Sequence, residues 1–405
     1  MAQLTPFRAL RPAPSVASRV ASVPYDVVNT AEARAMAQGE PLSFLRVTRS
    51  EIDLPDTVSP YHDAVYARAV ESLRGLRSAA PLVLDAEPTL YFYRQQMGAH
   101  VQTGLAGCFS VDEYERDLVK KHEKTRPDKE DDRTRHILEV GAQTGVVFLT
   151  YRASAAVDAI ALRACAGTPL YDFTAADGIR HTVWPVSSSD VSALVAAFAP
   201  IPELYIADGH HRAASAARAR AAMRDRGTPS PEADVFIGVA FPDTQLRILP
   251  YQRVVKDLWG HTQASFLDAL RSRLVVTDGD SQPDRPGQVS MFLGGRWHTL
   301  HLPQSPEGTA LADALDVSVL QRDVLTPVLG IGDPRTDKRI DFVGGVRGPG
   351  ALEVLVGSGQ AAVAFALHPV TVGDLIAISD AGGIMPPKST WFEPKLRDGL
   401  LVHQI

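Results

Sequence analysis

The residues best suited to chemistry lie at one tight turn, where a predicted strand runs directly into a predicted helix. The turn reads Asp208-Gly209-His210-His211-Arg212. The first N–H groups of a helix have no partner within it, and the helix dipole makes that end positive. Gly209 permits close approach of the backbone, and Arg212 can bind phosphate through two hydrogen bonds at once. With the donors of His210 and His211, the turn predicts a phosphate cradle.

Two other interpretations of this turn stay open. In the first, Asp208 caps the helix while the two histidines pack or form hydrogen bonds. In the second, Asp208, His210 and His211 bind a metal ion, although adjacent histidines rarely converge on one ion at a tight turn. We take Asp208, His210 and His211 as catalytic candidates and assign no metal ligand.

A second set of candidates lies in the C-terminal segment 382–399. Three prolines and several glycines stiffen and bend this segment, which also carries large apolar residues. We expect the tail to dock back on the body and to present cations and hydroxyls to an anion. The expected phosphate ligands are Lys388, Ser389, Thr390 and Lys395. The alternative is a docked tail whose lysines are simply solvated.

The densely charged segment 119–136 is the third candidate region, with a helix expected to resume from about Asp132. A run of both charge signs is typical of a solvated face. The alternative is a mobile lid that brings cations to phosphates and the carboxylates of Asp131 and Asp132 to Mg²⁺. The candidate lid residues are Lys124, Thr125, Arg126 and Arg133.

The N-terminal segment supplies a candidate base and candidate substrate contacts. Asp26 follows Val23-Pro24-Tyr25 and can act as a general base toward a hydroxyl, if the fold places it opposite the Asp208 turn. Tyr25, Arg46 and Arg49 are the candidate substrate-binding residues, the two arginines for a carboxylate. The alternatives are a helix cap for Asp26, a core position for Tyr25 and surface positions for Arg46 and Arg49.

Composition excludes several classes of protein. The 405 residues carry 41 Lys+Arg against 47 Asp+Glu, a net charge of −6, which disfavours broad binding to nucleic acid. Cys108 and Cys165 are too few for a disulfide framework. The N-terminus lacks an apolar signal region and no apolar run is long enough to span a membrane, so we expect a cytoplasmic protein. The sequence also lacks GxxxxGK[ST], GxGxxG, GxSxG and HExxH motifs.

The pattern of strands and helices predicts an α/β to α+β protein with a mixed-sheet core and a second α+β module. A buried strand is expected near 146–151, further strands near 203–207 and 234–241, and an Ala- and Arg-rich helix over 212–226. We expect a core domain over residues 1–257 with the charged loop inserted, the second module over 258–380, and the docking tail over 381–405.

Four segments together resemble the domain of unknown function 1015 family: 23–55, 90–136, 205–216 and 385–400. The turn Asp208 to Arg212 is also similar to the phosphate-binding turn of the ParB/sulfiredoxin superfamily, which includes free-serine kinases. That resemblance implies ParB/sulfiredoxin-like elements in the core, and transfer of a nucleotide phosphoryl group to free serine. It also implies a base from an N-terminal segment, either Asp26 or Glu32.

The leading hypothesis is therefore a kinase for free L-serine or a similar small acceptor, using ATP (or ADP) with Mg²⁺. The rival is a nucleotide-dependent regulatory or DNA-associated protein, since ParB relatives bind CTP and DNA. For this rival, Arg218, Arg220, Arg224 and Arg226 on one helix would form a local basic patch. A phosphatase or hydrolase using the same cradle is a third reading. The expected partners are a small substrate and a nucleotide, and the oligomeric state, monomer or homodimer, is left open.

Overall fold

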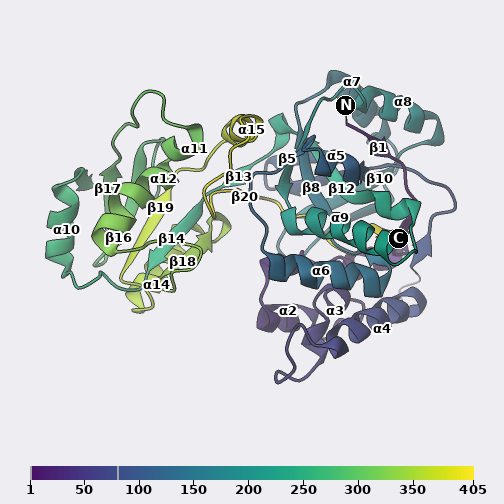
Figure 1. Cartoon of the computed structure of the whole chain (residues 1–405), viewed down its shortest axis with the longest axis horizontal. Helices are drawn as coiled ribbons and strands as arrows, with labels where there is room; N and C mark the ends of the chain where they lie inside the picture. The colour runs from purple at the N-terminus through teal and green to yellow at the C-terminus, as the bar shows by residue number, and fades with distance from the viewer. Residues whose placement is uncertain (1, 80–81) are drawn as a thin grey trace. The chain divides into compact units, whose positions relative to one another are not determined.

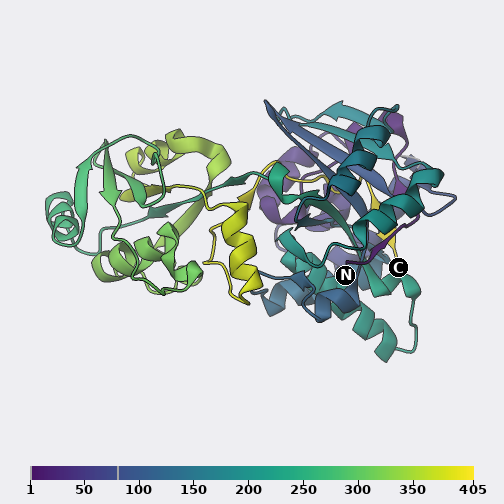
Figure 2. The ribbon, with the colours of Figure 1, turned by 90° about the horizontal axis from the view of Figure 1, so that it is seen from above.

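The computed structural model describes residues 2–79 and 82–405, which divide into two compact units (Figures 1 and 2). The first unit runs to Leu246 and includes Pro394–Ile405, and the second is Arg247–Glu393. The division precedes the predicted boundary at 257 because β14 (Tyr251–Val255) pairs with strands of the second unit. Of the expected tail 381–405, only the part from Pro394 onward belongs to the first unit.

A mixed sheet forms the centre of the first unit. The pairs β6/β11 and β8/β12 are parallel, and the remaining neighbours are antiparallel. This arrangement confirms the predicted mixed-sheet core. The strands, in their order across the sheet, are β6 (Val119–Lys120), β11 (Leu204–Asp208), β8 (Val147–Tyr151), β12 (Val235–Pro242), β5 (His100–Ser110), β4 (Tyr91–Met97), β10 (Arg180–Pro185) and β9 (Tyr171–Thr174), with β1 (Leu4–Thr5) paired to β5.

Helices surround this sheet, and α6 and α9 lie side by side (Figure 1). The α-helices are α1 (Ala17–Val20), α2 (Thr30–Ala37), α3 (Leu45–Thr48), α4 (Asp63–Ala79), α5 (Val111–Glu115), α6 (Pro127–Val140), α7 (Ala155–Ala164), α8 (Ser188–Phe198) and α9 (His210–Asp225). The 3₁₀ turns are η1 (Pro14–Val16), η2 (Tyr25–Val27), η3 (Ser50–Asp53), η4 (Pro231–Asp234) and η5 (Asp243–Gln245). Throughout the described ranges, none of the helices combines the length and the apolar character that a membrane crossing requires.

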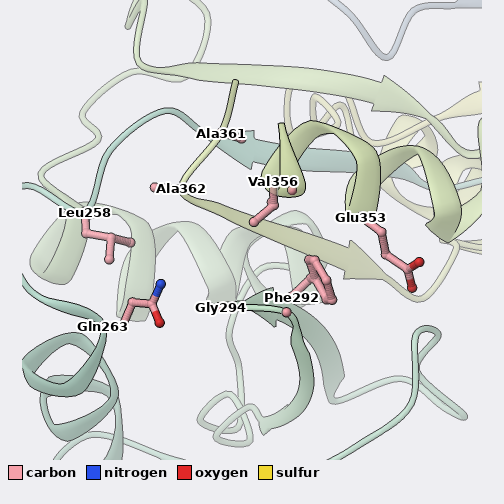
Figure 3. Close-up of a pocket in the computed structure, with 10 residues that line it drawn as sticks. Leu258, Gln263, Phe292, Gly294, Glu353, Val356, Ala361 and Ala362 are labelled. Atoms are coloured by element: carbon pink, nitrogen blue, oxygen red, sulfur yellow. The ribbon is translucent and has the colours of Figure 1, made fainter. Parts of the chain in front are cut away.

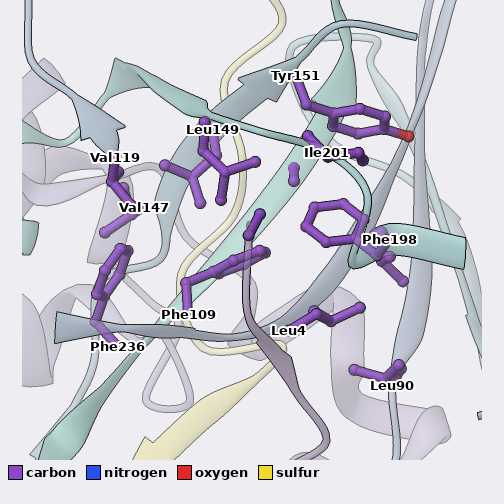
Figure 4. Packing of buried hydrophobic residues seen from close by; sticks show 14 of the residues in the cluster. Leu4, Leu90, Phe109, Val119, Val147, Leu149, Tyr151, Phe198, Ile201 and Phe236 are labelled. Carbon is purple, nitrogen blue, oxygen red and sulfur yellow. The ribbon is translucent and has the colours of Figure 1, made fainter. Parts of the chain in front are cut away.

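The core of the first unit lies where the central strands meet α7, α8 and α9. Phe109, Phe198 and Phe236 are each at most 1% exposed and pack against aliphatic residues of β8 and β11 (Figure 4). Burying a side chain of this size stabilises the fold by about 1.5–3 kcal/mol. The core therefore fixes the end of β11, from which the Asp208 turn emerges.

A small antiparallel sheet holds the chain's last residues on the first unit. Its order is β3 (Val83–Leu84), β2 (Ala9–Arg11), β21 (Val402–Gln404) and β7 (Ala142–Gln143). Just before β21, Gly399 has a φ of +86°, and a Cβ there would lie 2.6 Å from Cγ of Phe44. Glycine is required at this position for both reasons. The tail is thereby fixed beside the N-terminal segment.

The second unit is an antiparallel sheet with helices, as predicted for an α+β module. The sheet order is β15 (Val275–Asp278), β17 (Arg296–His301), β16 (Gln288–Leu293), β19 (Val363–Leu367), β14 and β18 (Ile340–Gly344), and β13 (Ile248–Leu249) pairs separately with β20 (Trp391–Phe392). The helical elements are α10 (Gln263–Arg271), α11 (Leu311–Ala314), α12 (Asp316–Leu320), the π-helical turn η6 (Gln321–Leu325), α13 (Thr326–Leu329), η7 (Gly345–Arg347), α14 (Gly348–Gly357) and α15 (Val372–Asp380). α11 and α12 are separate helices because Leu315 between them is extended, with ψ of 143°.

Candidate functional site

The predicted strand–turn–helix is present without a linker. β11 ends at Asp208, Gly209 follows with a φ of 97°, and α9 begins at His210. The first intrahelical hydrogen bond runs from the Ala213 N–H to the Gly209 carbonyl, at 3.0 Å. The N–H groups before Ala213 thus precede the ladder of the helix, at its positive end. The backbone geometry is that of a helix N-terminus, an end at which negative charge is favoured.

Arg212 faces inward, which corrects the expectation that its guanidinium is presented outward to phosphate. Only 4% of its side chain is exposed. Its Nη1 donates to the Val146 carbonyl at 2.6 Å, and its Nη2 donates to both oxygens of Asp26, at 3.0 and 2.8 Å. Burial alone would lower the pKa of Arg212, but nearby carboxylates, Asp26 foremost, outweigh it and the pKa is raised. Arg212 is a fixed cation that organises the turn.

Asp26 lies beside the turn, although 186 residues separate it from Arg212. Its side chain is 32% exposed, so the carboxylate borders solvent while Arg212 holds it. Glu32, the other candidate base, accepts the Asn29 N–H at 2.9 Å in the capping box of α2. Tyr25 is 8% exposed, and its ring centroid lies 4.5 Å from the Arg133 guanidinium. Among these N-terminal residues, Asp26 is therefore the carboxylate that the fold brings to the turn.

Lys395 and Asp208 form the second ion pair of the site, with 3.0 Å between Nζ and the nearer carboxylate oxygen. The same oxygen lies 3.7 Å from Nη2 of Arg212. Burial raises the pKa of Asp208, but Lys395 and Arg212 outweigh it and hold the pKa well below its usual range. Gln95 donates to the Lys395 carbonyl at 2.7 Å, which anchors the tail beside the turn. The tail therefore supplies a cation to the turn.

The two histidines of the turn hold the segment that precedes α6. Nε2 of His210 accepts the backbone N–H of His122 at 3.3 Å, and Nε2 of His211 accepts that of Arg126 at 3.0 Å. A ring nitrogen that accepts a hydrogen bond carries no proton, so these partners assign each imidazole as neutral with its proton on Nδ1. Burial lowers the pKa of both, in keeping with this state. The rings offer Nδ1–H donors.

The side chains that could together bind a metal ion are not Asp208, His210 and His211, the set considered from the sequence, but His122, Glu123 and His210. One ligand atom each from His122, Glu123 and His210 lie within 4.8 Å of one another. The Nδ1 of His210 is 4.0 Å from Glu123, but it carries the proton when Nε2 accepts from His122. A metal ligand must offer a lone pair at that nitrogen. The group as placed does not fit a metal ion.

The expected lid divides between a short loop and a helix. Helix α6 begins at Pro127, earlier than the expected Asp132, because proline suits the first helical position and acids follow it in the first turn. Arg133 is therefore a helix residue, bonded to Asp132 and to the Thr48 carbonyl. Lys124, Thr125 and Arg126 lie in the loop, where Arg126 pairs with Asp128 at 2.9 Å and Thr125 bonds to Glu130.

Other predicted ligands have partners elsewhere. Arg46 pairs with Asp53, and Arg49 pairs with Glu51 at 3.1 Å, so their described contacts hold the segment around α3 and η3 together. Lys388, Ser389 and Thr390 belong to the second unit. There the Lys388 ammonium lies 5.3 Å from the Tyr251 ring centroid, and the Ser389 hydroxyl donates to the Pro386 carbonyl at 2.7 Å. Lys395 belongs to the first unit and contacts the turn through Asp208.

Sequence reasoning missed Asp398, which is fully buried next to these groups. Burial raises its pKa to about 7, against the opposing effect of Arg212. The residue stands in an Asp-Gly pair, as Asp208 does, and that repeated dipeptide in a tail rich in glycine was the available signal.

Buried His136 on α6 predicts acid sensitivity of the first unit. Burial lowers its pKa to about 4, and Nε2–H donates to the Val47 carbonyl at 2.9 Å. As pH falls from about 6.5 to about 4, His136 binds a proton in the unfolded chain but not in the folded chain. This difference removes about 3 kcal/mol of stability. Denaturant titrations of His136→Gln at several pH values should show that this loss of unfolding free energy between about pH 6.5 and about pH 4 is absent. The exposed His62→Gln is the control, and an unchanged slope in His136→Gln would contradict the prediction.

A pocket of about 380 Å³ lies within the second unit (Figure 3). Its polar side chains are Gln263 and Glu353, and Glu353 accepts the Trp297 indole N–H at 2.8 Å. The described lining offers no cation for a phosphate. We therefore place the candidate site at the Asp208 turn, where two carboxylates, two cations and the N–H groups of the first turn of α9 converge.

Solved structures with similar folds are distant. SbnI with a C-terminal truncation, from Staphylococcus aureus, is 14% identical, covering 73% of this chain and 86% of that chain with a TM-score of 0.40. Free serine kinase in complex with AMP is 11% identical, covering 71% and 86%, with a TM-score of 0.36. A conserved hypothetical protein from Pyrococcus furiosus is 14% identical, covering 72% and 93%, with a TM-score of 0.35.

Comparison with the curated proteins finds no match. The family model described as "Protein of unknown function (DUF1015)" matches residues 4–318, more than half of the chain and all of the Asp208 turn. The family expected from the sequence is thereby confirmed: the chain belongs to the DUF1015 family.

Proposed function

We propose that this protein is a small-molecule kinase that transfers a nucleotide phosphoryl group to the hydroxyl of free L-serine or a similar acceptor. The observation that carries the proposal is the position of Asp26, a solvent-bordering carboxylate held by Arg212 at the N-terminus of α9. A carboxylate beside an anion cradle is what this transfer needs, because phosphoryl transfer depends mainly on positioning and charge stabilisation.

In the proposed reaction, the acceptor oxygen forms a bond to the terminal phosphorus of ATP, and the bond from that phosphorus to the bridging oxygen breaks. ADP leaves with the bridging oxygen, and the hydroxyl proton passes to Asp26. The N–H groups at the start of α9, the Lys395 ammonium and the Nδ1–H donors of His210 and His211 would bind the phosphates. Arg212 orients the Asp26 carboxylate through the two hydrogen bonds from its Nη2.

The turn does not fit a resident Mg²⁺ ion. The carboxylate of Asp26 is bound by Arg212, and that of Asp208 by Lys395. Asp131 pairs with Arg218, and Asp132 with Arg133 at 2.8 Å. A carboxylate neutralised by a protein cation is a poor ligand for a second cation. In this proposal magnesium enters as part of the magnesium–nucleotide substrate.

The arginines of α9 weigh against the DNA-binding alternative. Arg218 pairs with Glu130 at 3.1 Å, Arg220 pairs with Glu115 at 2.7 Å, and Arg224 pairs with Asp234 at 2.5 Å. A basic patch that binds the phosphate backbone needs cations that are not already neutralised by nearby carboxylates. The pairing leaves little net positive charge along this part of the helix.

The direct test combines purified protein with magnesium–ATP and serine. We expect serine-dependent release of ADP and a new phosphomonoester signal in phosphorus NMR. Release of inorganic phosphate without a phosphomonoester would instead identify a hydrolase. Salt-dependent binding to duplex DNA without ADP release would favour the regulatory alternative.

Lys395 provides a prediction for nucleotide affinity. Lys395→Met removes the ammonium beside Asp208 and leaves that carboxylate facing the phosphates, so we expect ADP to bind about tenfold more weakly. Isothermal titration calorimetry measures the change. The matched control is Lys388→Met in the second unit, for which we expect the wild-type affinity. Equal weakening in both variants would contradict the assignment of Lys395.

A further inference from the structure

Asp398 is a buried carboxyl that the proposed transfer does not use. Its backbone pairs with Ser22, with N···O distances of 2.9 and 3.1 Å, and Gly399 fixes the next position of the chain. The residue is 0% exposed. Its position beside the N-terminal segment is therefore determined by the backbone on both sides.

The Asp398 side chain is linked to Arg212 through Val146. Oδ1 of Asp398 accepts the Val146 N–H at 3.4 Å, and the Val146 carbonyl accepts Nη1 of Arg212 at 2.6 Å. A Cβ on the preceding Gly145 would lie 3.0 Å from Cδ of Arg212, so the backbone approaches this side chain closely. Val146 thus joins the buried carboxyl to the cation that holds Asp26.

The second carboxyl oxygen, Oδ2, is buried and accepts no hydrogen bond from the residues that the structure describes. An ionised carboxylate in this position lacks the hydrogen-bond donors that would compensate for its loss of hydration. A protonated carboxyl avoids most of that cost. The geometry therefore favours the neutral form of Asp398.

The charges that face Asp398 come from several elements. Arg212 on α9 favours ionisation, whereas Asp26 of η2 and Asp208 of β11 oppose it. Tyr93 of β4 also interacts with Asp398. Burial is the largest effect, and the pKa of Asp398 is raised to about 7. With Asp398 neutral, the ionised groups Asp26, Asp208, Arg212 and Lys395 balance in charge.

We propose that Asp398 is a proton-carrying positioning residue: its neutral carboxyl supports the Val146 backbone that orients Arg212, and it keeps its proton when a phosphoryl anion binds at the turn. The identity of the anion rests on the proposed function. An added anion makes ionisation of Asp398 still less favourable, so binding is coupled to uptake of a proton. Affinity for the anion must then fall as pH rises through the range in which Asp398 ionises.

The first experiment measures ADP binding by calorimetry at about pH 6 and about pH 8, in buffers of different ionisation enthalpy. For the wild type we expect proton uptake on binding near neutral pH and about tenfold weaker binding at the higher pH. Asp398→Asn keeps the shape and the acceptor for the Val146 N–H but cannot ionise, so we expect its affinity to change little with pH. Asp158→Asn, at an acid of α7 whose pKa burial also raises, is the matched control and should follow the wild type. The same pH dependence in Asp398→Asn as in the wild type would overturn the proposal.

The second experiment needs neither nucleotide binding nor a stable variant. Infrared difference spectra of the wild-type protein should contain the C=O band of a protonated carboxyl that disappears near neutral pH. Asp398→Asn, where it folds, should lack this band. If no such band titrates, the proposal fails even if the protein is a kinase. If the band titrates but ADP does not bind at any pH, the proposed function fails while the neutral state of Asp398 stands.

Discussion

Replacing Asp26 by Asn should reduce serine-dependent ADP release by about 10²–10⁴-fold, the usual contribution of a general base. The asparagine side chain keeps a carbonyl oxygen for Nη2 of Arg212, which now donates to both Asp26 oxygens at 3.0 and 2.8 Å. It cannot accept the acceptor's proton. We therefore expect kcat to fall sharply while the affinity for ADP changes much less. The measurement is the steady-state rate against serine and ATP, with calorimetry for ADP.

The matched control is Asp172→Asn. Asp172 pairs with Arg180 at 2.6 Å and is 34% exposed, close to the 32% of Asp26, but it lies on β9 at the opposite edge of the sheet from β11. Loss of an exposed ion pair there should leave the rate unchanged. An Asp26→Asn protein with the wild-type rate, or the same loss in both variants, would remove Asp26 from the reaction.

Replacing Arg212 by Ala should destabilise the first unit by about 3 kcal/mol, because removing one partner of a buried ion pair leaves the others uncompensated. The guanidinium is the common partner of Asp26 and the Val146 carbonyl and lies 3.7 Å from Asp208. Arg212→Lys restores the charge, but a single ammonium cannot occupy both Nη positions. We expect it to recover part of the stability and little of the activity. Denaturant titration measures the stability of each variant, and the ADP-release assay measures its activity.

Arg180→Ala provides the comparison for Arg212. Its guanidinium is 53% exposed and pairs with Asp172 at the sheet edge. Exposed ion pairs contribute little to stability, so this variant should unfold close to the wild type. If Arg212→Ala proved equally mild in its effect on stability, Arg212 would not be the organiser of the turn.

Local sequence alone predicted the turn correctly. An apolar strand followed by Asp208-Gly209 and an alanine-rich run has few alternatives, because Gly209 accepts a left-handed φ and the following residues strongly favour helix. The capping box at Asn29 and the paired strands β4 and β5 follow from similarly local preferences. The family was also accessible, because its segments are long and contiguous.

Tertiary structure alone decided which side chains share the site. Local pattern cannot say that Arg212 bonds to a carboxylate 186 residues away, that Asp26 and not Glu32 borders the turn, or that Asp398 lies buried beneath it. Tertiary structure also buried the Arg212 guanidinium, which the sequence had led us to expect on the outside of the protein. Such pairings are chosen by the free energy of burying charges together, which depends on the packed neighbours of each group and not on the residues adjacent to it in the chain.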